Sequence, residues 1–343
     1  MPNDVLTRAI DALASGHDLP REQAGAVLGE MMRGDASESQ LAAFLIALRT
    51  KGESVDELVG LATTMRRLAK PVRTSPTDLI DTAGRGGGRQ TFNVSTTAAL
   101  IAAGAGCAVA KHGNRSATGL SGSADVLEAL GARIDLKPDA VARCIDRAGF
   151  GFMFAPAHHA ATRFVVPVRK ELAVRTLFNF LGPLTNPAGT RRQLIGVSDP
   201  AFLERMAGAL ARLGCDRALL VSSEDGLDEM STSAPTHVVE VNSEAVRRYV
   251  VAPADVGIDT ASFDAVRGGT PEENARTTRA ILAGDDGAPR DIAVLNAGAA
   301  IYAGAIASSL TEGVDVARSA IDSGAARRTL DDYVAMSREL APA

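Results

Sequence analysis

The sequence predicts an α/β protein in two parts, a small all-helical unit followed by a larger domain in which helices cover a sheet. Three observations support this prediction. The chain has 343 residues, more than a single compact domain usually holds. Roughly the first seventy residues carry only helical periodicity. From about residue 78 onward, short apolar runs alternate with helical patterns, which is typical of a sheet with helices on its faces.

The helical unit shows two start signals. The segments "SESQ" (37–40) and "SVDE" (54–57) both have the sequence of a capping box, in which a serine and an acidic or amide side chain satisfy the first free N–H groups of a helix. Each precedes apolar residues at helical spacing, and these predict two buried stripes: Leu41, Phe44, Leu45 and Leu48, then Leu58, Leu61, Met65 and Leu68.

The larger part begins where the periodicity changes. Five short apolar runs predict strands near residues 78–82, 107–111, 150–155, 218–223 and 237–241. Between them, residues 123–130 and 199–213 have helical patterns. A further helical pattern, 169–187, ends in a Gly-Pro, Asn-Pro loop, and it fits packing against either the N-terminal helices or the sheet.

The composition argues against several classes of protein. The net charge is −5 and no run of five basic residues occurs, so a nucleic-acid partner is not expected. No apolar run reaches the roughly 18 residues of a membrane span, and the amphipathic N-terminus lacks the apolar core of a signal peptide, so we expect a cytoplasmic protein without a membrane partner. Cys107, Cys144 and Cys215 lie in apolar segments and predict buried thiols rather than a disulfide or zinc site.

A glycine-rich loop is the first candidate for a binding site. Residues 81–100, "DTAGRGGGRQTFNVSTTAAL", place four glycines within five positions and then enter a predicted helix near Ser95 or Thr96. Glycines let backbone N–H groups approach a ligand, and a helix start adds further N–H groups, so the pair suits a phosphate. A flexible connector explains the glycines equally well.

Polar residues follow two other predicted strands. Lys111, His112, Asn114 and Arg115 come directly after the apolar residues 107–110, where cationic and amide groups suit an anionic ligand. A solvated surface loop is the alternative. Asp228 and Glu229 follow the strand near 218–223, and adjacent carboxylates on a loop favour a hard cation such as Mg2+. An acidic turn in solvent explains them equally well.

The segment 155–172 brings two histidines and several cations together. His158 and His159 are adjacent and lack a third ligand at a useful spacing, so a metal site is not favoured there. Arginine binds carboxylates with two parallel hydrogen bonds, which makes Arg169 the better candidate for a binding residue.

Taken together, these motifs resemble the anthranilate phosphoribosyltransferase family. The resemblance extends in the family's order over nearly the whole chain, from "QLAAFLIALRTKGES" to "GGTPEENARTTRAILAG" and "NAGAAIYAGA". Its most specific parts are "KHGNR" and "FNFLGPLTNP", supported by "TFNVST", "SGSADVLEALGA" and "DGLDE".

The resemblance implies a fold and an activity. A helical domain (1–72, completed by about 169–188) would stand beside an α/β domain (73–343) with a central mixed sheet surrounded by helices. The protein would be a homodimer through the helical domain. The implied reaction of tryptophan biosynthesis moves phosphoribose from phosphoribosyl diphosphate to the amine of anthranilate and uses Mg2+.

The resemblance also implies roles for individual residues. Lys111, Asn114 and Arg169 would be catalytic, and Arg169 would face the anthranilate carboxylate. Ser95, Asp228 and Glu229 would hold magnesium. Residues that would bind the two substrates are Gly84, Arg85, Gly86, Gly87, Asn93, Ser95, Thr96, Lys111, His112, Asn114, His159 and Arg169.

The chain departs from the family pattern in the glycine-rich loop. "GRGGGRQ" is one residue shorter than the family's usual loop and lacks its threonine and aspartate, while Arg85 and Arg89 flank the glycines. These arginines could replace lost contacts to diphosphate. The change equally fits a related enzyme with another donor or aromatic acceptor, or a paralogue that binds ligands without turnover. A pyrimidine-nucleoside phosphorylase is disfavoured because it would carry a Lys-Xaa-Ser phosphate loop. Ala173 is a smaller departure, at a position where the family usually has glycine.

Overall fold

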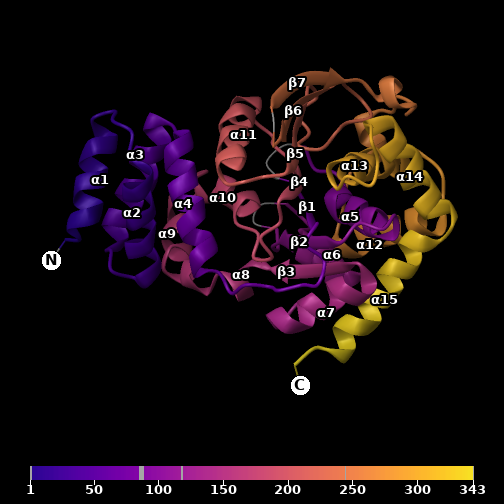
Figure 1. Ribbon diagram of the computed structural model, residues 1–343, viewed down its shortest axis with the longest axis horizontal. Helices are drawn as coiled ribbons and strands as arrows, with labels where there is room; N and C mark the ends of the chain where they lie inside the picture. Colours follow the sequence, from indigo (N-terminus) through magenta and orange to yellow (C-terminus); the bar gives the residue numbers. More distant parts are fainter. Residues whose placement is uncertain (1, 85–88, 117–118, 244, 343) are drawn as a thin grey trace.

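The computed structural model describes residues 2–84, 89–116, 119–243 and 245–342. Its two parts are seen in Figure 1, where a group of helices stands beside a larger body built on a sheet. The predicted fold class is thereby confirmed. The helices of the first part are α1 (Asp4–Ala14), α2 (Arg21–Arg33), α3 (Glu38–Lys51) and α4 (Val55–Leu68).

The start of α4 follows the sequence prediction, and the start of α3 follows it in part. At α4, Ser54 and Glu57 form the complete capping box. At α3, the Ser37 hydroxyl accepts from the Gln40 N–H, but the Gln40 side chain instead bonds both backbone groups of Asn3 and so ties α3 to the start of α1. The predicted apolar stripes are buried except for Leu68, which is 41% exposed because α4 ends there.

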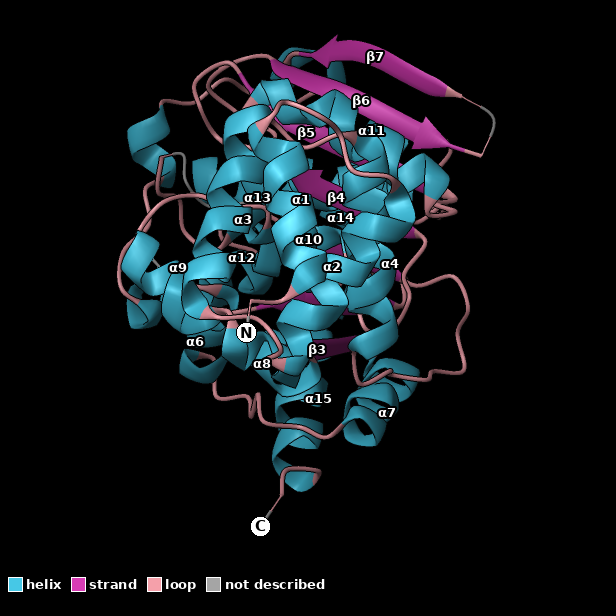
Figure 2. Cartoon of the chain, turned by 90° about the vertical axis from the view of Figure 1, so that its left-hand side faces the viewer, coloured by secondary structure: helices cyan, strands magenta, loops and turns pink. Residues whose placement is uncertain are grey.

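The second part contains a seven-stranded mixed sheet in the order β3-β2-β1-β4-β5-β6-β7. The first five strands are parallel. The strands β6 and β7 are antiparallel additions at one edge, which Figure 2 shows. The sequence prediction did not include β4 and β7. The strands are β1 (Ile80–Ala83), β2 (Val109–Gly113), β3 (Phe150–Phe154), β4 (Arg192–Gly196), β5 (Arg217–Ser223), β6 (Thr236–Asn242) and β7 (Val246–Val251).

The helical pattern predicted over residues 169–187 is wrong as one helix, because it is divided in two. Ala173 adopts a left-handed conformation with φ of 51° and ends the first piece, and the second begins at Phe178. The remaining helices are α5 (Val94–Gly104), α6 (Ser123–Ala129), α7 (Pro138–Ala148), α8 (Ala155–His158), α9 (Val166–Leu172), α10 (Phe178–Leu184), α11 (Leu203–Arg212), α12 (Pro271–Ala283), α13 (Ala288–Ala303), α14 (Leu310–Asp322) and α15 (Ala325–Glu339), with short 3-10 turns at Ala160–Phe164, Pro200–Phe202, Pro253–Val256 and Phe263–Val266.

Alternating strand residues divide the interior into two apolar clusters. Leu194 and Leu219 point to the cluster that contains α5 and α13, whereas their neighbours Ile195 and Leu220 point to the cluster that contains α11 and the N-terminal helices. The second cluster also includes residues of α9 and α10, which pack against α3 and α4. The three cysteines are buried in these clusters, as predicted. The division of the chain at 72/73 stays a prediction.

The strand order locates a crevice at one edge of the sheet. β1 has β2 on one side and β4 on the other. The chain therefore runs from β1 toward one side of the sheet and from β4 toward the other, and the loops that follow these two strands separate at the carboxyl ends of the strands. Ligands of open α/β sheets bind at such a point. Among the described residues, no helix combines the length and apolar character needed to cross a membrane.

Candidate active site

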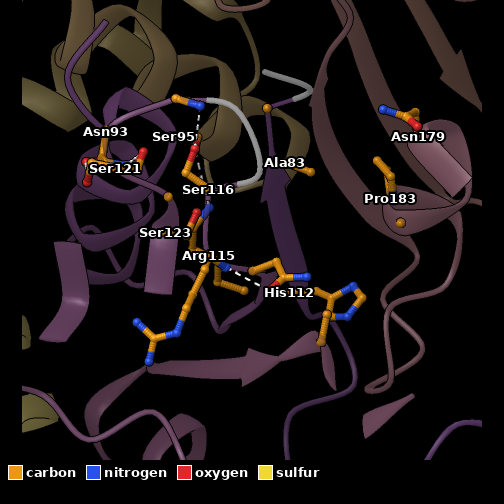
Figure 3. A pocket seen from close by; sticks show the side chains of 18 of the residues that line it. Ala83, Asn93, Ser95, His112, Arg115, Ser116, Ser121, Ser123, Asn179 and Pro183 are labelled. Atoms are coloured by element: carbon orange, nitrogen blue, oxygen red, sulfur yellow. Dashed lines mark hydrogen bonds between the residues drawn. The ribbon is translucent and has the colours of Figure 1, made fainter. Parts of the chain in front are cut away.

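A cavity of about 940 Å3 lies at this carboxyl edge. Its walls come from the loops after β1, β2 and β5, and on the opposite side from α9, α10 and Met65 of α4. Figure 3 shows this arrangement, with Asn93 and Ser121 on one side of the hollow and Asn179 and Pro183 on the other. The cavity therefore lies between the sheet domain and residues that pack on the N-terminal helices.

Three oxygen-bearing side chains converge at the end of β1. A Cβ added to Gly84 would lie 3.2 Å from Asp228 Oδ2, 3.9 Å from Glu229 Oε1 and 3.9 Å from Ser95 Oγ. The space beside the Gly84 Cα is thus a small cradle of oxygen atoms that any larger residue would fill. The loop after β5 approaches because Gly196 of β4 has no side chain, since a Cβ there would lie 1.9 Å from the Asp228 carbonyl oxygen.

This cradle fits a magnesium ion. Burial and the neighbouring Asp228 carboxylate raise the pKa of Glu229 well above its usual value. Within the described parts of the chain, Glu229 Oε2 has no hydrogen-bond donor, although the atom is buried. Two adjacent carboxylates with an unsatisfied oxygen are stabilised by a hard divalent cation, and Mg2+ commonly takes one or two carboxylates and completes its shell with water and phosphate oxygens. No group of three or more acidic, histidine or cysteine side chains forms a metal site among the described residues, so substrate oxygens would be needed.

Lys111 brings a buried cation to the same place. Its side chain is 1% exposed, and Nζ donates to the Thr82 carbonyl oxygen at 2.6 Å and to Thr82 Oγ1 at 3.2 Å. Ser95 Oγ lies 3.5 Å away. Burial lowers the pKa of Lys111 to about 8, and the carboxylates of Asp81 and Glu229 oppose that effect. The ammonium group therefore stands next to the oxygen cradle, where negative ligand charge would favour its protonated form.

A buried hydrogen-bond network holds the end of β2. Asp81 Oδ1 accepts from the His112 backbone N–H at 3.1 Å, and Oδ2 accepts from Asn186 Nδ2 at 2.8 Å. Asn186 also donates to the Ala110 carbonyl oxygen. The Asn-Pro turn after α10 is thereby fixed to β1 and β2, and the backbone around Lys111 and His112 has a defined position.

Two neutral histidines line the cavity, His112 from β2 and His159 from the residue after α8. The His112 and His159 rings lie with their centroids 5.1 Å apart. Burial, together with neighbouring histidines, lowers the pKa of His112 to about 3 and that of His159 to about 4. Both rings are therefore uncharged at pH 7. His158 faces away from the cavity, with Nδ1 3.1 Å from the Lys70 carbonyl oxygen.

Arg169 of α9 supplies a cation on the side of the cavity that α9 and α10 form. Its Nη2 lies 3.4 Å from Asn179 Oδ1, and its guanidinium carbon lies 5.2 Å from the centroid of the Phe178 ring. Burial lowers the pKa of Arg169 somewhat, but an arginine stays charged at pH 7. No carboxylate pairs with it in the described part of the chain. Arg169 is thus a half-buried charge that lines a cavity without a counter-ion.

The other predicted binding residues divide between the cavity and its surroundings. Asn93 and Asn114 line the cavity, as do Gly84 and Ser95. Thr96 does not line it, because it is buried on α5 behind Ser95. Arg115 also lines the cavity, but its guanidinium group pairs with Asp125 and Glu128 of α6, and its role toward an anionic ligand stays a prediction.

Part of the predicted donor loop lies outside the described residues, namely Arg85, Gly86 and Gly87. Arg89 is described and lines the cavity. Its guanidinium carbon lies 4.1 Å from the centroid of the Phe263 ring, a distance at which a cation is attracted to an aromatic face. A donor-binding role for Arg85 or Arg89 stays a prediction.

Comparisons with known proteins bear on this geometry. Residues 7–69 match the helical bundle domain, and residues 76–327 the a/b domain, of the glycosyl transferase family. The anthranilate phosphoribosyltransferase of Symbiobacterium thermophilum is 52% identical over 320 residues, covering 93% of this chain and 94% of the relative. That of Rubrobacter xylanophilus is 51% identical, with 98% of this chain and 99% of the relative covered. The chain belongs to the anthranilate phosphoribosyltransferase family.

Solved structures of this family have the same fold. The Thermus thermophilus anthranilate phosphoribosyltransferase superposes with a TM-score of 0.91 at 44% identity and covers 96% of this chain and 99% of its own. The Saccharomyces cerevisiae enzyme in complex with PRPP and Mg superposes with a TM-score of 0.88 at 26% identity, covering 98% of both chains. The resemblance stated from the motifs is confirmed.

Several residues that shape this anthranilate phosphoribosyltransferase site were missed by sequence reasoning. Four of them form hydrogen bonds with predicted site residues, namely Asp81, Asn179, Ser121 and Asn274. The fifth, Asn186, holds Asp81 in place. Asn179, Asn186, Ser121 and Asn274 lie within motifs that carried the family resemblance, whereas Asp81 begins the glycine-rich segment 81–100. A search for buried polar residues in those motifs could therefore have found them.

Proposed function

We propose that the chain transfers the 5-phosphoribosyl group from phosphoribosyl diphosphate to the amine of anthranilate, giving N-(5-phosphoribosyl)anthranilate and diphosphate in tryptophan biosynthesis. The observation that carries the proposal is that one cavity presents two unlike ends. An oxygen cradle with a buried lysine stands at the end of β1, and Arg169, which has no counter-ion among the described residues, stands on the opposite side. A phosphorylated donor fits the first end and an aromatic carboxylate fits the second.

The reaction places different demands on the two ends. The amine nitrogen of anthranilate forms a bond to C1 of the ribose with its lone pair, and the bond from C1 to the diphosphate oxygen breaks. Diphosphate leaves with that electron pair, and the nitrogen loses a proton. An aniline-type amine is already neutral at pH 7, so no strong base is required before attack. Most of the difficulty lies in the charge that develops on the departing diphosphate.

The residues at the donor end suit that charge. Lys111 would stabilise the departing oxygens, and Asn93 and Ser95 would bind the donor at the start of α5. Asp228, Glu229 and Ser95 would hold Mg2+, which neutralises diphosphate charge when bound. The bare backbone at Gly84 leaves room for both ion and substrate.

The residues at the acceptor end suit a flat anionic ring. Arg169 would bind the anthranilate carboxylate, and the neutral His112 and His159 rings would flank the aromatic face without attracting a second anion. Asn114 lines the cavity between the two ends and would orient the amine toward C1. Positioning of this kind supplies a large part of the catalysis of a two-substrate reaction.

A fluorescence assay of anthranilate consumption tests the proposal. Purified protein with phosphoribosyl diphosphate and Mg2+ should consume anthranilate and release diphosphate in equal amounts. Omission of either the donor or the metal should stop the reaction. Binding of both ligands without consumption would contradict the proposal and favour a paralogue that has lost turnover.

We also propose a homodimer through the helical domain. Apolar side chains remain exposed on α3, on α9 and just after α9, namely Ile46 at 36%, Val166 at 38% and Val174 at 44%, and α3 packs against α9. Light scattering after size-exclusion chromatography tests this, because a single chain would scatter as 35.5 kDa. The cytoplasmic location and the lack of nucleic-acid and membrane partners stay predictions from the sequence.

A further inference from the structure

Asn93 sits at the cavity wall with most of its hydrogen-bonding groups already used. Its Oδ1 accepts from Ser121 Oγ at 2.9 Å and from Asn274 Nδ2 at 2.9 Å. Its Nδ2 donates to the Ser121 carbonyl oxygen at 3.2 Å. The pairing of Asn93 with Ser121 is seen in Figure 3. An asparagine amide has two lone pairs and two N–H hydrogens, so both lone pairs are occupied and one N–H is left.

Asn274 reaches Asn93 from a distant part of the chain. It lies in the first turn of α12, is 3% exposed and lines the same cavity. Its own amide orientation is determined by a backbone group, because the Gly269 N–H donates to Asn274 Oδ1 at 2.8 Å. A backbone N–H can only donate, so Asn274 must present its Nδ2 to Asn93.

The turn before α12 is built to hold this arrangement. Thr270 and Glu273 form a complete capping box at the start of the helix. Gly268 and Gly269 leave no room for side chains, since an added Cβ would lie 2.2 Å from the Thr91 carbonyl oxygen or 2.1 Å from Glu273 Oε2. Gly268 also donates to the Gln90 carbonyl oxygen. The segment that carries Asn274 is thus fastened to the residues just before Asn93.

We propose that Asn274 is a positioning residue that sets the amide orientation of Asn93, so that Asn93 presents an N–H rather than a carbonyl oxygen to the phosphorylated donor. This inference rests on the proposed function only in naming phosphoribosyl diphosphate as the ligand. With its amide reversed, Asn93 would turn an acceptor oxygen toward phosphate oxygens, which lack hydrogens to donate. Two backbone groups favour the correct orientation: the Gly269 N–H, which acts through Asn274, and the Ser121 carbonyl oxygen, which accepts from Asn93 Nδ2.

The decisive variant is Asn274→Asp. A carboxylate of the same shape still accepts from the Gly269 N–H, but it offers only acceptors to Asn93 and therefore favours the reversed amide. We expect the Kd of phosphoribosyl diphosphate, measured by calorimetry with Mg2+, to rise at least tenfold. The KM for the donor should rise in parallel, while the KM for anthranilate stays within about twofold. Asn274→Ala, which leaves the orientation of Asn93 to the Ser121 carbonyl oxygen alone, should show a smaller loss.

Thr278→Val is the matched control. Thr278 lies one turn further along α12 and forms a buried hydrogen bond of 2.9 Å with Thr97, which also donates to the Asn93 backbone carbonyl oxygen. Its loss therefore weakens the same helix contact without changing a partner of the Asn93 side chain. Thermal unfolding of the control and of Asn274→Asp shows whether stability alone explains a loss. Donor affinity in Thr278→Val should match that of the wild type.

A double-mutant cycle with Asn93→Ala tests whether Asn274 affects donor binding through Asn93. If Asn274 acts through Asn93, then Asn274→Asp should change donor affinity less than twofold in the Asn93→Ala background. Equal losses for both substrates, unchanged donor affinity in Asn274→Asp, or independent losses in the double variant would each overturn the inference. A wild-type protein that binds the donor but lacks turnover would contradict the proposed function instead, and the calorimetric comparison would still decide the role of Asn274.

Discussion

Replacement of Arg169 by alanine should separate binding of the acceptor from stability. Arg169 is half-buried, lines the cavity and has no carboxylate partner among the described residues. Its interactions within the protein are weak, since its polar contact to Asn179 is 3.4 Å long and its contact to the Phe178 ring is 5.2 Å. The loss of these contacts is offset by relief of a partly desolvated charge, so we expect the free energy of unfolding to change by less than about 1 kcal/mol.

The effect on the acceptor should be much larger. A charge-assisted hydrogen bond to a carboxylate contributes about 1.5–3 kcal/mol. Its loss corresponds to an increase of roughly 10- to 150-fold in the KM for anthranilate, with little change for phosphoribosyl diphosphate. The same substitution should matter far less for binding of 2-aminobenzamide, which has the amine and ring but no carboxylate.

Steady-state fluorescence kinetics with each substrate varied in turn provide the measurement. Lys170→Ala is the control, because Lys170 is an exposed cation at the next position of α9 and does not line the cavity. A role of Arg169 in binding the acceptor would be refuted if Arg169→Ala raised the KM for both substrates equally. It would also be refuted if the effect persisted with 2-aminobenzamide, or if the variant lost several kcal/mol of stability.

Four further outcomes are expected. Asp228→Ala with Glu229→Ala should abolish turnover yet leave thermal unfolding unimpaired, because two adjacent buried carboxylates repel each other; activity at limiting Mg2+ would contradict this. Gly84→Ala should weaken donor binding at least tenfold by filling the oxygen cradle, whereas Gly29→Ala in α2, where a Cβ meets only Arg33 at 3.4 Å, should leave kinetics unchanged. Arg89→Ala should lower donor affinity about tenfold in a calorimetric titration if a guanidinium replaces the missing loop contacts, and an unchanged Kd would make Arg89 a bystander. Ala173→Gly should raise the free energy of unfolding by about 0.5 kcal/mol in denaturant titration, since φ of 51° strains an alanine, and a loss of stability would count against that reasoning.

Local features of the chain were predictable because their causes are local. The apolar stripe from Leu41 to Leu48 and the capping box of Ser54 and Glu57 depend on neighbours within one or two turns. The strand that leads to Lys111 was predictable for the same reason, since a short apolar run with polar residues after it is specified by adjacent positions. The acidic pair Asp228 and Glu229 after β5 was predictable for the same reason.

Features that depend on distant partners were not predictable in the same way. Gln40 has the sequence of a capping residue, but it bonds Asn3 because α1 happens to lie alongside. Arg115 follows site residues in sequence and lines the same cavity, yet its guanidinium group is paired with carboxylates of α6, which the sequence does not indicate. Thr96 follows Ser95 directly, but a helix turns successive side chains by about 100°, which places it behind the cavity wall.

The sequence by itself determined the fold class, the family and the residue types available for the reaction, because each is written in short contiguous motifs. Only the tertiary structure decided which of these residues share one cavity. It brought Gly84, Ser95 and the acidic pair within 4 Å of one point, although they come from three separate segments. It also placed Asn274 against Asn93 across 181 positions of the chain. The physical reason is that strand order and helix packing set distances between remote residues, whereas periodicity and capping act over only a few.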